Sequence, residues 1–155
     1  MFRRIKYQKR ELPRVEAERI LMEGKSGVLA VAGDEGYPYA VPMSYVYHNG
    51  DLYFHSALSG HKLDAIAREE KVSFCVVAQD SVVPEKFTTC YQSAIAFGRA
   101  CIVTDSEEKR QALMALVEKY APDHIESGRR YLEADFNQTA VVKVTMEHLT
   151  GKSSV

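Results

Sequence analysis

The sequence has few of the features that mark secreted, membrane or nucleic-acid-binding proteins. Its three cysteines, Cys75, Cys90 and Cys101, are an odd number and form no Cys-x-x-Cys pair, which argues against a disulfide framework and a zinc site. No window approaches the ~18 apolar residues of a membrane span, and the charged start lacks the apolar run of a signal peptide. A formal net charge of -1 argues against a large basic face for nucleic acid. We therefore expect a cytoplasmic protein that binds no nucleic acid, membrane or metal.

What the chain does contain is ordinary globular composition, with 46% apolar and 26% charged residues. Its 155 residues (1–155) are most simply one domain that can bury a substantial core. Residues 1–13 are polar and predict an extended arm. Basic side chains gather there, which we interpret as a solvated or interface-facing arm: Arg3, Arg4, Lys6, Lys9 and Arg10.

The apolar pattern predicts about six strands and two or three helices, and most strands follow one another as hairpins. Regular βαβ alternation is absent, which disfavours a doubly wound parallel sheet. A mainly β (α+β) fold, a small antiparallel barrel with peripheral helices, fits better. The expected strands are 26–32, 38–47, 51–55, 72–78, 91–104 (bent at Gly98) and 139–150. The expected helices are 13–24, 105–121 and a short one within 125–136, and residues 63–67 form a further segment with helical spacing.

Two stretches carry specific expectations. Pro38 and Pro42 cannot donate ladder hydrogen bonds, so their strand should lie at a sheet edge or be interrupted around Pro42. An interruption would leave backbone groups of residues 43–45 free to meet a ligand. Residues 79–89 lack clear periodicity and predict a polar loop.

The stretch 38–68 contains the strongest chemical signal. Asn49-Gly50 can close a tight hairpin, and the strand after it leads through a turn of small residues into a helix start. Free backbone N–H groups at that start, the hydroxyls of Ser56 and Ser59, and the Lys62 ammonium could converge on a phosphate. The segment is neither a Walker loop nor a dinucleotide fingerprint.

His55, at the end of that strand, is the candidate for catalysis. Three roles are open: contact with a phosphate, proton donation to a substrate, or ligation of haem. The adjoining Ser56 and Lys62 favour ligand contact, with His55 positioning the ligand rather than reacting. His61 is expected to shape the turn.

The sequence resembles the pyridoxamine 5′-phosphate oxidase-like FMN-binding split-barrel family, and within it the 5-nitroimidazole resistance (Nim-type) branch. The resemblance runs nearly end to end. The segments that carry it are RR at 3–4, GVLA at 27–30, GYPYAVPMSY at 36–45, YFHSA at 53–57, GHK at 60–62, VSF at 72–74, VPEKF at 83–87, YQS at 91–93, FG at 97–98, EK at 108–109, KY at 119–120 and TGK at 150–152.

The resemblance implies a six-stranded split barrel that binds FMN at the interface of a homodimer. The segment Val41, Pro42, Met43, Ser44 and Tyr45 would lie along the flavin ring and ribityl chain. His55, Ser56 and Lys62 would hold or flank the 5′-phosphate, with Gly60 and His61 in the turn. The facing subunit would contribute Tyr91, Gln92 and Ser93.

A flavin-dependent reductase of small molecules follows from the resemblance, with nitro-aromatic compounds such as 5-nitroimidazoles as candidate substrates and NAD(P)H as a candidate donor. The alternatives are a non-catalytic flavin- or haem-binding protein and an oxidase related to pyridoxamine 5′-phosphate oxidase. The tail, LTGKSSV, lacks the Arg-rich segment that binds the substrate phosphate in the true oxidase, which leaves the Nim-like interpretation ahead.

Overall fold

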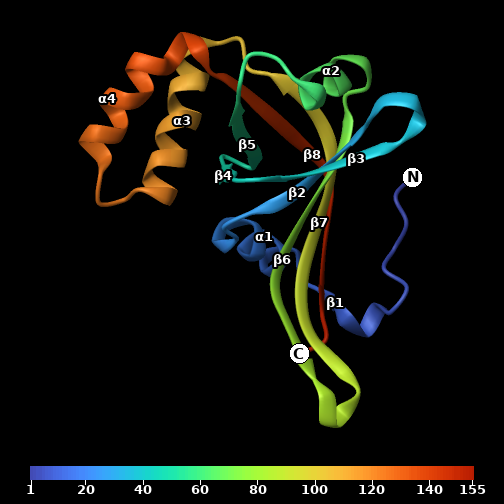
Figure 1. Ribbon diagram of the computed structural model, residues 1–155. Helices are drawn as coiled ribbons and strands as arrows, with labels where there is room; N and C mark the ends of the chain where they lie inside the picture. Colours follow the sequence, from blue (N-terminus) through green and yellow to red (C-terminus); the bar gives the residue numbers. More distant parts are fainter.

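Seven strands form one antiparallel sheet in the order β3-β2-β6-β7-β8-β5-β4, and a short strand, β1, pairs with β8 (Figure 1). The computed structural model describes residues 1–155. The strands are β1 (Glu11–Leu12), β2 (Gly27–Ala32), β3 (Pro38–Met43), β4 (Val46–His48), β5 (Asp51–Ser56), β6 (Lys71–Val83), β7 (Thr88–Ile102) and β8 (Ala140–Ser153). The helices are α1 (Arg14–Glu23), α2 (His61–Arg68), α3 (Ser106–Tyr120) and α4 (Ile125–Asp135), with short 3-10 turns at Gln8–Arg10, Asp34–Gly36, Pro84–Lys86 and Phe136–Gln138.

The sheet curls into a split barrel because its two edge strands are consecutive in the sequence. Only Ser44 and Tyr45 separate β3 from β4. These two strands lie at opposite edges of the sheet and do not pair, so the chain itself joins the two edges. Pro38 and Pro42 lie on the edge strand β3, as predicted. The interruption itself falls at residues 44–45 and not around Pro42, because an edge strand pairs on one side only and tolerates proline there. The mainly β fold with peripheral helices is thus confirmed, with a slightly larger strand count than expected.

Alternation along the strands fills the barrel interior. Leu29, Phe74, Ala96 and Leu149 are successive cross-strand partners on β2, β6, β7 and β8, and all four are buried. Helices α1 and α2 add apolar side chains to the same cluster and cover opposite ends of the barrel (Figure 1). The predicted bend of β7 occurs where its register with β8 shifts, between Phe97 and Gly98. A Cβ at Gly98 would collide with the backbone carbonyl of Thr145.

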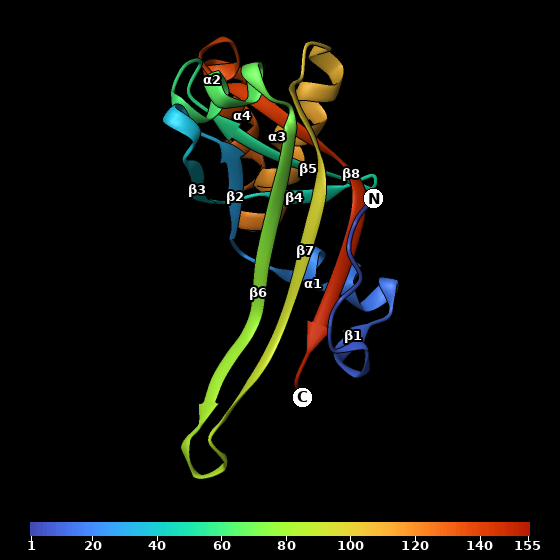
Figure 2. The same cartoon turned by 90° about the vertical axis from the view of Figure 1, so that its right-hand side faces the viewer.

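Residues 79–91 are the clearest departure from the expected secondary structure. Instead of a polar loop, they form the far end of the β6–β7 hairpin, which projects beyond the barrel (Figure 2). Residues 80–83 and 88–91 have ladder partners only in each other, and Phe87 at the tip is 97% exposed. A ribbon with no buried face needs no alternating apolar pattern, which is why periodicity did not reveal it.

Helices α3 and α4 form a second layer against the outside of β4, β5 and β8 (Figure 1). Asp105 caps the start of α3, because its carboxylate accepts a hydrogen bond from the Glu108 N–H at 2.8 Å. Nine buried residues, among them Tyr53, Leu116, Leu132 and Val141, make a hydrophobic cluster separate from the barrel interior. None of the helices is both long and apolar enough to cross a membrane.

Candidate functional site

The turn before α2 leaves its backbone donors free, as the sequence predicted. Gly60 is the N-cap residue with φ of 148°, a value that favours glycine, and no side chain caps the helix. An added Cβ at Gly60 would meet nothing within 4 Å, so space is open at the helix start. Lys62 is half-buried and makes no ion pair, whereas Arg68 at the other end of α2 binds Asp34 at 2.9 Å.

Two residues of the predicted turn are engaged elsewhere. The Ser56 hydroxyl donates a hydrogen bond to the Ala57 carbonyl at 2.7 Å. The His61 ring stacks on Tyr39, with centroids 4.1 Å apart, and its Nε2 lies 3.7 Å from Asp34 Oδ2. These contacts hold His61 against the 34–36 turn, consistent with a role in shaping the segment.

His55 and Ser56 lie on opposite faces of β5. Leu52 and Phe54 belong to the barrel interior, whereas Tyr53 belongs to the cluster under α3 and α4. Because side chains alternate along a strand, His55 points with Tyr53 toward the helical layer and Ser56 points the other way. The sequence grouped His55 with Ser56 and Lys62, and the structure places His55 on a different side from Ser56.

His55 faces a cavity of about 500 Å³ between the end of β5 and the α3–α4 hairpin. This volume lies within the range of small-molecule sites, roughly 300–1,000 Å³. No lysine or arginine lines it. The lining residues are Ser44, His55, Leu113, Leu116, Val117, Tyr120, Ala121, Gly128, Tyr131, Leu132, Asp135 and Thr139.

We expected the backbone of Tyr45, between β3 and β4, to be free for a ligand. Instead, both its N–H and its carbonyl are hydrogen-bonded within the chain. Its N–H donates to the Tyr120 hydroxyl at 3.0 Å, and its carbonyl accepts from Lys119 Nζ at 2.9 Å. The Lys119 ammonium also lies 3.9 Å from the centre of the Tyr45 ring, and burial lowers the pKa of Lys119 to about 8. Residues at the end of α3 therefore take the place that the sequence left for a ligand.

The Tyr45 side chain is also engaged within the chain. Tyr45 is fully buried, and its hydroxyl donates to the Leu21 carbonyl at 2.6 Å. Burial raises the pKa of this phenol. Of the other residues in this segment, Val41 and Met43 pack against the barrel interior, while Pro42 and Ser44 are exposed.

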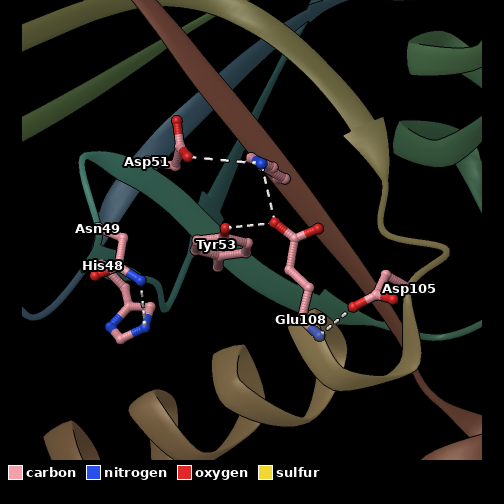
Figure 3. A network of polar contacts seen from close by, with 7 residues as sticks. His48, Asn49, Asp51, Tyr53, Asp105 and Glu108 are labelled. Carbon is pink, nitrogen blue, oxygen red and sulfur yellow. Dashed lines mark hydrogen bonds and ion pairs between the residues drawn. The ribbon is translucent and has the colours of Figure 1, made fainter.

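A polar network fixes α3 against the barrel and so sets one wall of the cavity (Figure 3). The Glu108 carboxylate accepts hydrogen bonds from the Tyr53 hydroxyl at 2.8 Å and from Lys143 Nζ at 2.9 Å. Lys143 Nζ also lies 3.7 Å from Asp51 Oδ2. Lys143 and Tyr53 lower the pKa of Glu108, and burial together with Glu108 raises the pKa of Tyr53 to about 12.

The third predicted group, Tyr91, Gln92 and Ser93, lies at the other end of the sheet. His55 pairs with Val141 of β8, whereas Ser93 pairs with Lys152. Eleven positions of β8 separate these partners, which at about 3.3 Å per residue amounts to roughly 36 Å along the strand. One chain alone therefore cannot bring the Tyr91 group to His55.

The outward side of the sheet carries exposed apolar side chains. Val28, Cys75 and Ile95 are successive cross-strand partners, and Phe97 lies two residues beyond Ile95 on the same face. Phe2 of the arm covers part of this face by packing on Phe97, with ring centroids 5.3 Å apart. We define the apolar sheet face as Val28, Cys75, Val77, Ile95 and Phe97, all of them exposed or half-buried.

The comparisons with known proteins agree with this architecture. The family model described as pyridoxamine 5′-phosphate oxidase matches residues 13–153. The chain belongs to this family. No curated protein matches the sequence.

Solved structures of related proteins cover almost the whole chain. A proposed 5-nitroimidazole antibiotic resistance protein from Bacteroides thetaiotaomicron is 27% identical, with a TM-score of 0.80 over 92% of this chain and 85% of that one. A flavocytochrome from Azotobacter vinelandii is 18% identical, with a TM-score of 0.84 over 98% and 72%. A FAD-binding protein from Mesorhizobium loti is 22% identical, with a TM-score of 0.66 over 94% and 98%. The last two show the fold alone.

The cavity is the feature of the site that the sequence did not predict. Its α3 wall contains Leu113, Leu116 and Val117, which the sequence places on one face of the helix expected at 105–121. The part from α4, including Gly128 and Leu132, had no recognised partner. A cavity between two elements produces no pattern in the sequence of either element. The apolar face of α3, followed by a second short helix, could however have suggested that the two helices pack together against the barrel.

Proposed function

We propose that this member of the pyridoxamine 5′-phosphate oxidase family is a cytoplasmic FMN-dependent reductase that works as a homodimer. The observation that carries the proposal is the pairing of an uncapped helix start, with an unpaired Lys62, and an apolar cavity that begins at His55, five residues earlier. The first suits the phosphate of a flavin nucleotide, and the second suits a small organic acceptor.

The residues at the start of α2 fit a phosphate. Backbone N–H groups at a helix start favour an anion, and a lysine in the first turn is disfavoured there unless an anion is bound. Gly60 keeps the approach open, since a Cβ there meets nothing within 4 Å. Lys62 would pair with the phosphate as a point charge. The bound flavin would supply electron transfer to the substrate.

Residues around the cavity would orient the substrate and exclude water. Leu116, Val117 and Leu132 present apolar surface, and no lysine or arginine lines the cavity, so an uncharged acceptor such as a nitro-aromatic compound fits better than a phosphorylated one. His55 would donate a hydrogen bond or a proton to the acceptor from the strand side. NAD(P)H would be the electron donor.

Three features support a homodimer. The apolar sheet face is larger than the few contacts of Phe2 can cover. The ribbon at residues 79–91 has no further strand beside it and is held to the rest of the chain near its base, by bonds such as those of Thr89 and Tyr91 to Ser154, although an isolated two-stranded hairpin is marginally stable in water. The residues Tyr91 to Ser93, far from His55 in one chain, would reach the flavin only of a facing subunit. A second copy would account for all three.

The visible spectrum of the purified protein is the first test. Flavin bands together with NAD(P)H oxidation in the presence of nitro-aromatic acceptors are the expected result. Flavin bands without turnover would indicate a binding protein, a Soret band would indicate haem, and neither band would contradict the proposal. Turnover of pyridoxamine 5′-phosphate with oxygen would assign the oxidase reaction instead.

Lys62→Ala should weaken the binding of FMN but not of riboflavin. Loss of a charge-assisted contact to the phosphate costs about 1.5–3 kcal/mol, which is roughly a tenfold to hundredfold rise in Kd. Quenching of flavin fluorescence measures both ligands. Lys71→Ala, which removes an exposed lysine at the start of β6, is the control and should change neither. Equal losses for FMN and riboflavin would place Lys62 away from the phosphate.

FMN should stabilise the dimer, because a ligand that bridges two chains favours the assembled state by mass action. Sedimentation with and without FMN measures this effect. Phe97→Asp, which places a charge on the apolar sheet face, should weaken both assembly and FMN binding. A monomer saturated with FMN would contradict the dimer.

A further inference from the structure

The cavity that begins at His55 has a polar end, where β5 stops and β8 begins. His55 is the cross-strand partner of Val141, and Thr139, two residues before Val141, lines the same cavity. Asp135, the last residue of α4, also lines it, and only the 3-10 turn Phe136–Gln138 separates Asp135 from Thr139. The α3 wall, by contrast, is mostly apolar. Polar groups therefore gather where β5, α4 and β8 meet, beside a largely apolar wall.

The Asp135 carboxylate has no partner within the chain. Asp135 is half-buried and lines the cavity, yet it forms neither an ion pair nor a side-chain hydrogen bond. The cations of α3 that reach the end of α4 have other partners. Arg110 binds Glu133 at 2.7 Å, and Lys109 Nζ donates a hydrogen bond to the Phe136 carbonyl at 2.6 Å. The charge of Asp135 is therefore left without a counter-ion from the protein.

The stability of α4 does not explain a carboxylate at this position. The C-terminal end of a helix carries partial negative charge, which favours a cation there and disfavours a carboxylate. The last turn of α4 contains no basic residue. A charge beside apolar surface also costs free energy unless it is paired, and His55, which lines the same cavity, does not pair with Asp135. The carboxylate thus favours a cation that comes from outside the chain.

Tyr131 adds a second group that suits a cation. It precedes Asp135 by four residues on α4, so the two side chains are neighbours on the same side of the helix, and both line the cavity. Tyr131 is 72% exposed, and the face of a tyrosine ring attracts an organic cation. No lysine or arginine lines the cavity to repel a positive charge. An unpaired carboxylate beside an open aromatic ring is suited to an ammonium group.

We propose that the cavity recognises a small organic cation, an aromatic molecule whose protonated amine binds the Asp135 carboxylate and the Tyr131 ring while its uncharged ring lies against the apolar α3 wall. This inference deepens the reductase proposal and rests on it for the role of that ring as electron acceptor. The reacting ring stays uncharged, as proposed above, and a side arm carries the charge. Asp135 is then a specificity-determining residue that favours cations and rejects anions.

The test uses ligands that share one nitrophenyl ring and differ in the charge of its side arm. At neutral pH 4-nitrobenzylamine is a cation, 4-nitrobenzyl alcohol is uncharged and 4-nitrobenzoate is an anion. Titration calorimetry measures the Kd of each ligand for the purified full-length protein in the presence of excess FMN and without an electron donor. Because no turnover is needed, the measurement reports recognition by the cavity separately from the reaction.

The unchanged protein should bind the amine about tenfold more tightly than the alcohol, the effect of one charge-assisted contact, and should bind the benzoate more weakly than the alcohol. Asp135→Asn keeps the size of the side chain and removes its charge. This variant should bind the amine and the alcohol alike, with the affinity for the alcohol unchanged.

Asp123→Asn is the matched control, because Asp123 lies in the exposed turn between α3 and α4, lines no part of this cavity and makes no ion pair. It should bind all the ligands as the unchanged protein does, and thermal unfolding checks that both variants are folded. The proposal would be overturned if the unchanged protein bound the amine no more tightly than the alcohol. It would equally be overturned if Asp135→Asn kept the preference, or if Asp123→Asn lost it to the same extent.

These outcomes can be separated from those of the reductase proposal. The comparison of ligands on the unchanged protein needs no variant, so it decides the question even if Asp135→Asn does not fold. If the protein binds no flavin but prefers the amine through Asp135, the reductase proposal fails and the cation site stands. If flavin-dependent turnover occurs and the three ligands bind alike, the reductase proposal stands and the cation site fails.

Discussion

The barrel interior and the layer under α3 and α4 are both apolar, but they are filled to different degrees. Twenty-one buried residues close the interior, and its largest side chains, such as Tyr45, Phe54 and Phe74, are fully enclosed. Nine buried residues form the layer, which leaves a cavity of about 500 Å³ open toward His55.

The difference in packing indicates that the barrel interior supports the structure and that the helical layer holds the candidate binding site. Six long strands and two helix faces converge on the interior, so side chains meet from all directions. Two helices joined by a short turn approach the barrel from one side only, and polar contacts such as Glu108 with Tyr53 and Lys143 hold them there. A ligand enters where packing is incomplete, and the closed interior keeps the walls in place.

The largest expected effect is on stability and comes from the interior. Phe74→Ala should lower the free energy of unfolding by about 3–5 kcal/mol, because the ring is enclosed and packs edge-on against Tyr45 with centroids 4.8 Å apart. Leu132→Ala in the helical layer should cost only about 2 kcal/mol, since the layer already contains a cavity that can relax. Urea unfolding measures both.

Val15→Ala, on the exposed side of α1, is the control and should change stability by less than about 0.5 kcal/mol. The comparison between the two regions breaks down if Leu132→Ala destabilises the protein as much as Phe74→Ala does. In that case the layer would be packed as firmly as the interior, and the cavity would not reflect weaker packing under α3 and α4.

The next effect concerns turnover. From the sequence we expected His55 to position a phosphate, but its side chain faces the cavity on the opposite side of β5 from Ser56. His55→Asn keeps a hydrogen-bond donor of similar size and removes titration near neutral pH. We therefore expect turnover to fall about 100-fold while flavin stays bound. Steady-state NAD(P)H oxidation and flavin absorbance measure the two properties.

His48→Asn is the matched control, because His48 lies in the β4–β5 hairpin and does not line the cavity. Its turnover should match that of the unchanged protein. Loss of flavin from His55→Asn, with turnover per bound flavin unchanged, would restore the positioning role that the sequence favoured.

The smallest effect concerns the contacts that hold α3. Glu108→Gln should lower stability by about 1 kcal/mol. Because Lys143 and Tyr53 lower the pKa of Glu108 in the folded state, the difference between the two proteins should be complete above the unfolded pKa, near 4.5. It should disappear as the pH falls through the folded pKa, which lies below that value.

Urea unfolding at several pH values checks this prediction. Glu107→Gln, one residue away on the exposed side of α3, is the control and should show no such pH dependence. A Glu108→Gln deficit that persisted well below pH 4 would mean that packing and not charge holds the helix.

Much of the fold was determined by local sequence. The strands that contain Leu29 and Phe74 were visible in the apolar pattern, the Asp105 cap as a residue type at a helix start, and the bend of β7 as Gly98. The turn at Gly60 also followed from local chemistry, because a helix start with glycine and lysine is a short-range signal. Each of these features depends on dihedral preferences or on which side of one element is buried.

Tertiary structure alone decided the rest. The ribbon at residues 79–91 has no buried side to create a pattern. The backbone of Tyr45 is hydrogen-bonded to Lys119 and Tyr120, which lie 74 and 75 residues away in the sequence. The cavity at His55 and the contact of Arg10 with Tyr91 arise where elements distant in the sequence meet or fall short of meeting. A linear pattern records what each element buries, but the space left between two elements depends on how they are placed relative to each other.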